Sequence, residues 1–239
     1  MDIQRHLPRL LPLGVAMVVA LGGCADSAPS SDADRPTILL VDAAGDVSRM
    51  MRLDPDAADA EVVRPVLAAS ARGLTLDRTE GILYWASREG DRIQFGRWNA
   101  ASVSELPVAG LDSAYSVEYL AADNALYWSD YGTNAIHRLD LGGGEVETLV
   151  DGLDAPRQIA IDAENRRLYW VDRGLGLVME RGLDDGSTRQ LATGLSAPYG
   201  LALVPGGEAM LVADAELGTL YRLDLSSLEL STWLEEAGT

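Results

Sequence analysis

The sequence predicts an all-β fold, a β-propeller of about five four-stranded blades with an incomplete first blade. Three observations lead to this prediction. A short aromatic motif recurs at a period in the low forties, each period divides into four short alternating runs, and no segment after the N-terminal region carries a sustained helical period. Four strands in such a period are typical of one propeller blade.

The recurring motif is clearest as LYWSD at residues 126–130. Near copies begin at residues 83 (LYWAS), 168 (LYWVD) and 210 (MLVAD), so successive starts lie 43, 42 and 42 residues apart. A weaker copy, ILLVD at 38–42, begins 45 residues before the first of these. Self-similarity at a fixed period of roughly 20 to 50 residues indicates a repeat architecture.

Each complete period contains four segments that read as strands. Runs of four to eight alternating residues, bounded by Asn, Gly and Asp turns, are strand signals. The third complete unit shows them best, as RQIAID (157–162), RRLYWVD (166–172), GLVMERGL (176–183) and STRQLAT (187–193).

Four units are complete, and a partial unit precedes them. The partial unit offers TILLVD, SRMMRLD and AEVVRPVL as strands, without an innermost partner. The favoured arrangement is a five-bladed ring whose first blade is incomplete. The alternative is an open arc that closes by self-association with a second chain, because an unpaired edge invites pairing. The complete units begin near Ala71, Ala114, Ala155 and Ala197.

The aromatic pair has a structural explanation. Adjacent side chains of a strand point to opposite faces, so one Tyr and one Trp can fill the interfaces on both sides of a blade. Burying one of them removes about 150 to 250 Å² from water, roughly 4 to 6 kcal/mol before the opposing loss of conformational entropy. The aromatic motif residues are Tyr84, Trp85, Tyr127, Trp128, Tyr169 and Trp170.

Two stretches carry a resemblance to a known family. LYWSDYGTNAIHRLDLGGG and APRQIAIDAENRRLYWVDRGLGLVMERGLDDGS resemble the YWTD repeats, the class B repeats of low-density-lipoprotein-receptor propellers. The resemblance covers nearly all of residues 37–239 and weakens in LYWAS, MLVAD and ILLVD. It implies that the carboxylate ending the motif ties strands and neighbouring blades by hydrogen bonds. This structural role is expected for Asp130, Asp172 and Asp214.

Residues 1–23 predict a lipoprotein signal peptide. A basic start precedes a short apolar run, and LGGC, ending at Cys24, resembles the bacterial lipobox, in which the chain is cleaved before a Cys whose thiol is lipidated. The run is shorter than the ~20 residues of a spanning helix. Residues 24–36 are expected to be the lipidated Cys and a flexible tether, since they contain no large apolar side chain. Residues 37–239 form the predicted YWTD-like propeller.

These N-terminal features predict a bacterial lipoprotein outside the cytoplasm, held to a membrane through Cys24. Ala25 after the Cys favours the outer membrane or cell surface over the inner membrane. Cys24 is the only Cys, so its lipidation would leave no disulfide for the fold. The net charge of −18, from 19 basic residues, all Arg, and 37 acidic ones, argues against nucleic acid as a partner because such a surface repels phosphates.

Binding residues are sought where the repeats differ, because shared positions build the scaffold. Two sets of loops are expected on one face of the ring: those entering the innermost strands and those following the motif. Arg offers a bidentate fork and Tyr a flat face with a hydroxyl, which suits a protein or peptide ligand. Alternatively, these side chains cap the interfaces beneath them. The candidate rim residues are Arg72, Tyr115, Arg157 and Tyr199 in the first set, and Arg88, Tyr131, Asn134 and Arg173 in the second.

The sequence predicts no catalytic residue, cofactor or metal ligand set. His137 stands alone, no Ser has a His partner at a recognisable spacing, and HExxH and phosphate-binding Gly loops are absent. The enzymatic alternative is a metal-dependent propeller hydrolase of the gluconolactonase or strictosidine-synthase type. Glu118 on an innermost strand is its one unusual residue, but such a metal needs several oxygen ligands. An interblade salt bridge from Glu118 to an Arg is the favoured expectation.

Overall fold

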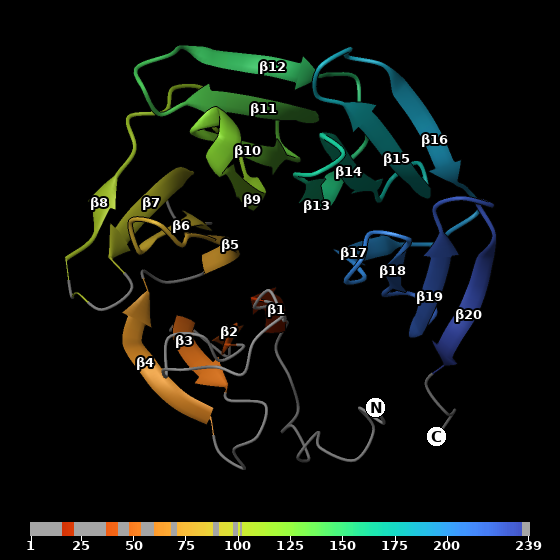
Figure 1. Cartoon of the computed structure of the whole chain (residues 1–239), viewed down its shortest axis with the longest axis horizontal. Helices are drawn as coiled ribbons and strands as arrows, with labels where there is room; N and C mark the ends of the chain where they lie inside the picture. The colour runs from red at the N-terminus through yellow and green to blue at the C-terminus, as the bar shows by residue number, and fades with distance from the viewer. Residues whose placement is uncertain are drawn as a thin grey trace.

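The computed structural model describes residues 16–21, 37–42, 48–53, 60–67, 71–87, 91–97, 100 and 102–235. Within this part of the chain the regular structure is almost entirely β, in five sheets of four antiparallel strands arranged around a ring (Figure 1). A single 3-10 turn, Ala121–Asp123, interrupts the described strands. No helix among these residues is long and apolar enough to cross a membrane. The prediction of a propeller with about five four-stranded blades is confirmed.

The blades follow one another along the chain, and each runs from its innermost to its outermost strand. Their strands are β1 (Ala16–Leu21), β2 (Thr37–Asp42), β3 (Ser48–Leu53) and β4 (Ala60–Leu67) in the first; β5 (Ala71–Asp77), β6 (Ile82–Ser87), β7 (Arg92–Arg97) and β8 (Ser104–Glu105) in the second; β9 (Ala114–Leu120), β10 (Ala125–Asp130), β11 (Ala135–Asp140) and β12 (Val146–Val150) in the third; β13 (Pro156–Asp162), β14 (Arg167–Asp172), β15 (Leu177–Gly182) and β16 (Thr188–Ala192) in the fourth; and β17 (Pro198–Leu203), β18 (Ala209–Asp214), β19 (Thr219–Asp224) and β20 (Leu230–Glu235) in the fifth.

The first blade has a fourth strand that the sequence analysis did not assign to it. β1 comes from the apolar run of the predicted signal peptide, and it pairs antiparallel with β2, from Ala16 opposite Asp42 to Leu21 opposite Thr37. An extended segment here satisfies the backbone groups along the inner edge of β2, which would otherwise lack a partner. Removal of the segment before Cys24 would leave the three strands of the prediction. The signal peptide and its cleavage stay predictions.

The motif aromatics fill the interfaces between blades, on opposite faces of their strands. Trp128 packs in one buried cluster with Tyr84 of the preceding blade. Trp170 packs in the next cluster with Tyr127 of the third blade. The Tyr therefore faces the following blade and the Trp the preceding one, as the alternation of a strand requires. Trp85, Trp128 and Trp170 are almost completely buried.

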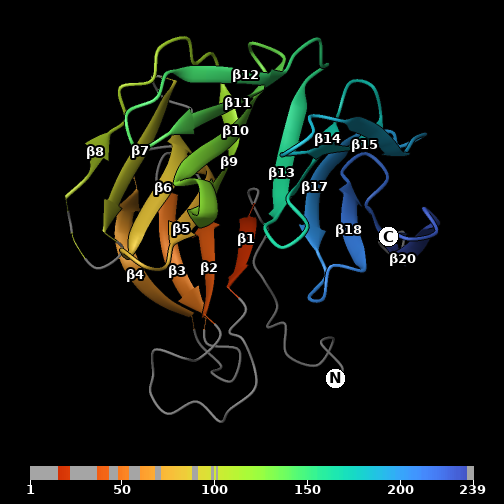
Figure 2. The ribbon, with the colours of Figure 1, turned by 45° about the horizontal axis from the view of Figure 1, so that its top comes forward.

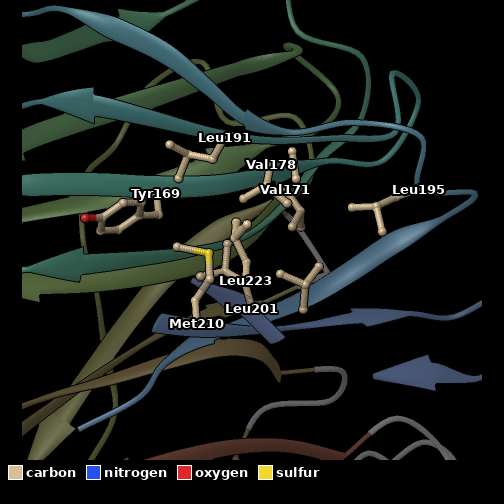
Figure 3. Packing of buried hydrophobic residues seen from close by; sticks show 10 residues of the cluster. Tyr169, Val171, Val178, Leu191, Leu195, Leu201, Met210 and Leu223 are labelled. Atoms are coloured by element: carbon tan, nitrogen blue, oxygen red, sulfur yellow. The ribbon is translucent and has the colours of Figure 1, made fainter. Parts of the chain in front are cut away.

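The last interface is built from aliphatic side chains instead of a Trp (Figure 3). Val212 takes the Trp position of the fifth blade and is fully buried. Tyr169 of the fourth blade still faces this interface, as its sister tyrosines do in theirs. The shared position therefore tolerates a change of residue as long as it stays apolar. The labelled side chains in Figure 3 are Tyr169, Val171, Val178, Leu191, Leu195, Leu201, Met210 and Leu223.

Successive blades pack through their innermost strands, but the ring is open between its ends. β5 lies against β9, β9 against β13, and β13 against β17, and β1 contacts β5. β5 and β9, the innermost strands of the second and third blades, lie side by side where these two blades meet (Figure 2). No packing of this extent joins the described strands of the fifth and first blades, which lie apart in Figure 1. Among the described strands the arrangement is thus that of the alternative, the open arc, and not the closed five-bladed ring that was favoured from the sequence. Closure against a second chain stays a prediction.

Candidate functional site

Each candidate Arg or Tyr of the first loop set lies at a β-bulge near the start of an innermost strand, beside the residue that ends the motif. We call this end of the ring the mouth. In β5, the pairing moves from Ala71 to Leu74 while the partner strand moves only from Ser87 to Trp85, so β5 carries one extra residue. Equivalent register shifts occur in the pairs of β9, β13 and β17. A bulge turns the strand locally and redirects its side chains, and bulges are common at barrel rims and beside active sites. The residues at these bulges include Arg72, Tyr115, Arg157 and Tyr199.

The carboxylate that ends the motif holds the two loop sets together. Asp130 accepts hydrogen bonds from the backbone N–H groups of Asp112 (2.8 Å), Gly132 (3.0 Å) and Thr133 (3.1 Å). The loop after the motif is thereby fixed beside the loop that enters the innermost strand, which places Tyr131 near Tyr115. The two later repeats use the same geometry, in which Asp172 accepts from Asp154 (2.9 Å) and Asp214 accepts from Ser196 (2.7 Å).

Ser129 fixes the backbone that carries Arg157. Its hydroxyl donates to the Arg157 carbonyl oxygen across the interface between the third and fourth blades (2.6 Å). The same hydroxyl accepts from the Ser116 N–H (3.2 Å), and the Ser116 hydroxyl accepts from the Ile159 N–H (3.3 Å). The sequence analysis missed this role of Ser129. The signal was present, because the other complete motifs have Ala86, Val171 or Ala213 at this position.

Two arginines and three tyrosines from four blades meet at the mouth. The Arg157 Cζ atom lies 4.2 Å from the ring centroid of Tyr131, 5.1 Å from that of Tyr115 and 5.6 Å from that of Tyr199. The Arg72 Cζ atom lies 5.2 Å from the centroid of Tyr131 and 5.4 Å from that of Tyr115. These are cation–π distances. We call Arg72, Tyr115, Tyr131, Arg157 and Tyr199 the arginine–tyrosine cluster.

The arginines of the cluster have no carboxylate partner within the described part of the chain. No ion pair there includes Arg72 or Arg157, and Arg72 Nη1 and Arg157 Nε are buried without a hydrogen-bond acceptor. Burial lowers the pKa of Arg157, with nearby tyrosines opposing the shift. The fold pairs many other arginines with carboxylates, namely Arg92, Arg97, Arg138, Arg166, Arg167, Arg189 and Arg222.

The tyrosine hydroxyls of the cluster have different environments. Burial is the main cause that raises the pKa of Tyr115, followed by its hydrogen bond with Tyr199. The Tyr115 and Tyr199 rings meet edge to face, with centroids 5.4 Å apart. Ser113 and Arg72 hold the pKa of Tyr131 below its usual value.

The other candidate rim residues fall into three groups. Arg173 is exposed and lies near enough to Arg157 to lower the pKa of that guanidinium. Asn134 accepts a hydrogen bond from the Ala155 N–H (3.0 Å), so its amide oxygen holds the connecting loop rather than facing outward free. Arg88 lies outside the described residues, as does Cys24.

The residues considered for catalysis have structural partners. His137 is buried against Trp128, and its two ring nitrogens bond to the hydroxyls of Thr133 (2.9 Å) and Thr148 (3.2 Å). Burial lowers the pKa of His137. Within the described segments, no group of three or more His, Cys, Asp or Glu side chains is placed to hold a metal ion.

Glu118 does not form the expected salt bridge to an Arg among the described residues. Its carboxyl accepts a hydrogen bond from the Thr75 hydroxyl of the neighbouring blade instead (3.4 Å). The same Thr75 oxygen accepts from the Tyr119 N–H (3.1 Å). Burial raises the pKa of Glu118 to about 8, and the Thr75 bond opposes this shift. A carboxyl kept largely neutral needs no cationic partner, which explains the difference from the expectation.

A hollow of about 490 Å³ lies at the end of the third and fourth blades opposite the arginine–tyrosine cluster. Its charges are paired within the protein: Arg166 bonds to Asp123 (2.8 Å) and Asp184 (2.7 Å), and Tyr127 donates to Asp123 (2.6 Å). Arg138 donates to the Tyr127 hydroxyl (3.2 Å). This paired network contrasts with the arginine–tyrosine cluster, where Arg72 Nη1 and Arg157 Nε lack acceptors among the described residues.

No family model matches the chain. A stretch of 77 residues is 35% identical to low-density lipoprotein receptor-related protein 4 of human, mouse and rat, and it spans 32% of this chain and 4% of those receptors. A chain of the nidogen/laminin complex superposes with a TM-score of 0.72 at 20% identity, over 82% of this chain and 74% of that chain. The chain folds as a YWTD-type β-propeller.

Two further solved structures share the propeller fold at lower similarity. TolB from Acinetobacter baumannii matches the YWTD-type propeller with a TM-score of 0.66 and 17% identity, over 81% of this chain and 50% of that chain. A streptogramin B lyase matches with a TM-score of 0.58 and 15% identity, over 69% and 54%. At such low sequence identity the structural similarity shows the fold alone, and function has to be argued from the site.

Proposed function

We propose that this propeller is a protein- or peptide-binding module of the bacterial cell envelope, and that its ligand docks on the arginine–tyrosine cluster. The observation that carries this proposal is the pair Arg72 and Arg157, two guanidinium groups without a carboxylate partner among the residues that the structure describes, in a chain of net charge −18. Arg and Tyr are enriched among the residues that dominate binding energy at protein interfaces.

The nidogen/laminin structure supports a protein as the ligand, because it is a protein–protein complex with a chain of this fold. The streptogramin B lyase shows that enzymes also use the architecture. No arrangement of the described residues favours the metal-dependent hydrolase alternative, since Glu118 is engaged by Thr75 and no metal-ligand group accompanies it.

The proposed envelope location rests on the sequence. The lipobox-like LGGC places Cys24 for lipidation, and more than one acyl chain would give a stable anchor. Cleavage before Cys24 would remove β1 and expose the inner edge of β2, through which the mature protein could associate with a second copy. Intact mass of protein extracted from membranes tests both steps. A mass matching residues 1–239 without lipid would contradict them.

Replacement of both cluster arginines tests the binding surface. The full-length Arg72→Ala/Arg157→Ala variant should lose its envelope partners in a pull-down, while its thermal unfolding stays close to that of the wild type. Arg97→Ala is the matched control, because it removes an exposed arginine from the opposite end of the second blade. Unchanged partners together with reduced stability would show that the cluster caps the interfaces and binds nothing.

A further inference from the structure

We infer that the arginine–tyrosine cluster is a carboxylate-binding subsite that takes an Asp or Glu side chain of the ligand. This inference rests on the proposed function and specifies its chemistry. It follows from unsatisfied hydrogen-bond donors, from the spacing of the two guanidinium groups and from the charge of the remaining surface.

The unsatisfied donors are the first argument. Arg72 Nη1 and Arg157 Nε are buried and have no acceptor among the described residues. A buried donor without a partner costs free energy, and the cost is larger for a charged group. A carboxylate supplies two oxygens that accept charge-assisted hydrogen bonds from guanidinium groups in a planar, bidentate manner. A carboxylate is therefore the ligand group that best suits guanidinium donors left without an acceptor.

The spacing of the guanidinium groups is the second argument. Both Cζ atoms lie close to the same two rings, those of Tyr131 and Tyr115, so the two guanidinium groups border the same pair of tyrosines. The Tyr131 ring lies 4.2 Å from the Arg157 Cζ atom and restricts that guanidinium in the free protein. A side chain already held in place loses less entropy on binding.

The fold itself gives the third argument. The chain has 37 acidic residues, and its salt bridges join many other arginines to carboxylates. Arg72 and Arg157 have no such partner among the described residues, although acidic side chains are abundant. Arg173 adds a third positive charge near Arg157. A cluster that only stabilised the fold would be expected to use an internal carboxylate, as the paired network around Arg166 does.

The net charge restricts what can carry the carboxylate. A surface with a net charge of −18 repels polyanions, so a nucleic acid or a strongly acidic protein approaches unfavourably. A neutral or basic partner that presents one acidic side chain avoids this repulsion and still reaches the cluster. Electrostatic complementarity of this kind mainly controls the rate of association and the choice of partner.

Peptide selection tests the inference on the full-length protein. A displayed random peptide library is selected on the wild type, and clones that also bind the Arg72→Gln/Arg157→Gln variant are removed. The remaining peptides should share an Asp or Glu, and its exchange for Asn or Gln should weaken binding at least about tenfold, the loss expected when a charge-assisted hydrogen bond is removed. The Arg97→Gln variant, which lacks an arginine paired with Glu80, should bind the peptides normally.

Two outcomes separate the inference from the proposed function. Cluster-dependent peptides that need no acidic residue would overturn the carboxylate subsite and leave the binding module standing. Absence of any cluster-dependent peptide would overturn both.

A titration of the wild type avoids dependence on the fold of the variant. Tyrosine fluorescence or NMR should detect N-acetyl-aspartate amide at the cluster and detect N-acetyl-asparagine amide much more weakly. Equal binding of both compounds contradicts the carboxylate inference. Inorganic phosphate binding as well as the aspartate derivative would identify a general anion site instead and would likewise contradict the specificity for carboxylate.

Discussion

The Arg157 guanidinium lies over the Tyr131 ring, with Cζ 4.2 Å from the ring centroid, although the two residues belong to different blades. Arg157 stands on β13 of the fourth blade, and Tyr131 follows β10 of the third. Ser129, two residues before Tyr131, also bonds to the Arg157 carbonyl oxygen. The third blade thus holds both the backbone and the side chain of Arg157.

Replacement of Arg157 by Met should separate binding from stability. Met keeps a flexible apolar stem and removes a partly desolvated charge for which the described part of the chain supplies no carboxylate partner. We expect the free energy of unfolding to stay within about 1 kcal/mol of the wild type or to rise, while ligand binding is lost. Urea unfolding and peptide binding measure the two effects. A loss of more than about 2 kcal/mol would mark Arg157 as a structural residue.

The interblade tryptophans should carry far more stability than the exposed one. Trp170 is completely buried between the third and fourth blades, whereas Trp233 on β20 is 55% exposed. Trp170→Ala should lower the free energy of unfolding by about 3 to 5 kcal/mol through lost apolar contacts and a cavity. The matched change Trp233→Ala should cost less than about 0.5 kcal/mol. Similar costs for both variants in urea unfolding would contradict the stacked-blade packing.

Much of the fold could be predicted from the sequence because each repeat corresponds to one blade and its aromatic pair to the two interfaces of that blade. The period fixes the blades, and the adjacent Tyr and Trp can reach both faces of a strand, as Tyr127 and Trp128 do. The open ring was less predictable, since closure depends on how the first and fifth blades meet and no local pattern encodes that contact. The assignment of residues 16–21 to β1 was also missed, because a short apolar run suits a signal peptide and a buried strand equally well.

The site was predictable as a set of residue types and positions, but its geometry was not. The Arg and Tyr positions followed from comparing the repeats, whereas their convergence depends on bulges in the innermost strands that no motif marks. Asn134 shows what the comparison of repeats could not predict. Its place in the loop indicated a rim residue, but its amide oxygen accepts a hydrogen bond from the Ala155 N–H. Interblade bonds such as Ser129 to Arg157 join residues 28 positions apart, beyond the reach of local sequence reasoning.

Gly132 should be required for the mouth to form. A Cβ atom at this position would overlap the Asp112 carbonyl oxygen, so the loop that carries Tyr131 could not close against its neighbour. Gly132→Ala should therefore destabilise the protein by about 1 to 3 kcal/mol and weaken binding at the cluster. At Gly200 a Cβ atom would make an ordinary contact with Ala213, at 3.6 Å, so Gly200→Ala is the control and should be tolerated. If the two variants unfold alike and bind alike, the close approach at Gly132 is not required for stability or for binding at the cluster.

Glu118 should make the stability of the propeller depend on pH above neutrality. Burial raises its pKa from 4.5 to about 8 in the folded protein. Between these two values the folded state keeps a proton that the unfolded chain releases, so the free energy of unfolding falls as the pH rises through this window. At pH values above about 8 the cost is complete, because the carboxylate is then ionised in the folded state as well, at a position where burial disfavours its charge.

Glu118→Gln should remove this dependence, since a neutral amide still accepts the Thr75 hydrogen bond and does not ionise. We expect the variant to match the wild type near pH 5 and to exceed its free energy of unfolding by about 1 to 3 kcal/mol at pH 9. This is less than the full equivalent of the shift, because Glu118 retains some exposed surface. Urea unfolding from pH 5 to 9 measures the difference, with Glu164→Gln in an exposed turn as the control. Parallel pH profiles of wild type and Glu118→Gln would mean that Glu118 ionises in the folded protein as freely as in the unfolded chain.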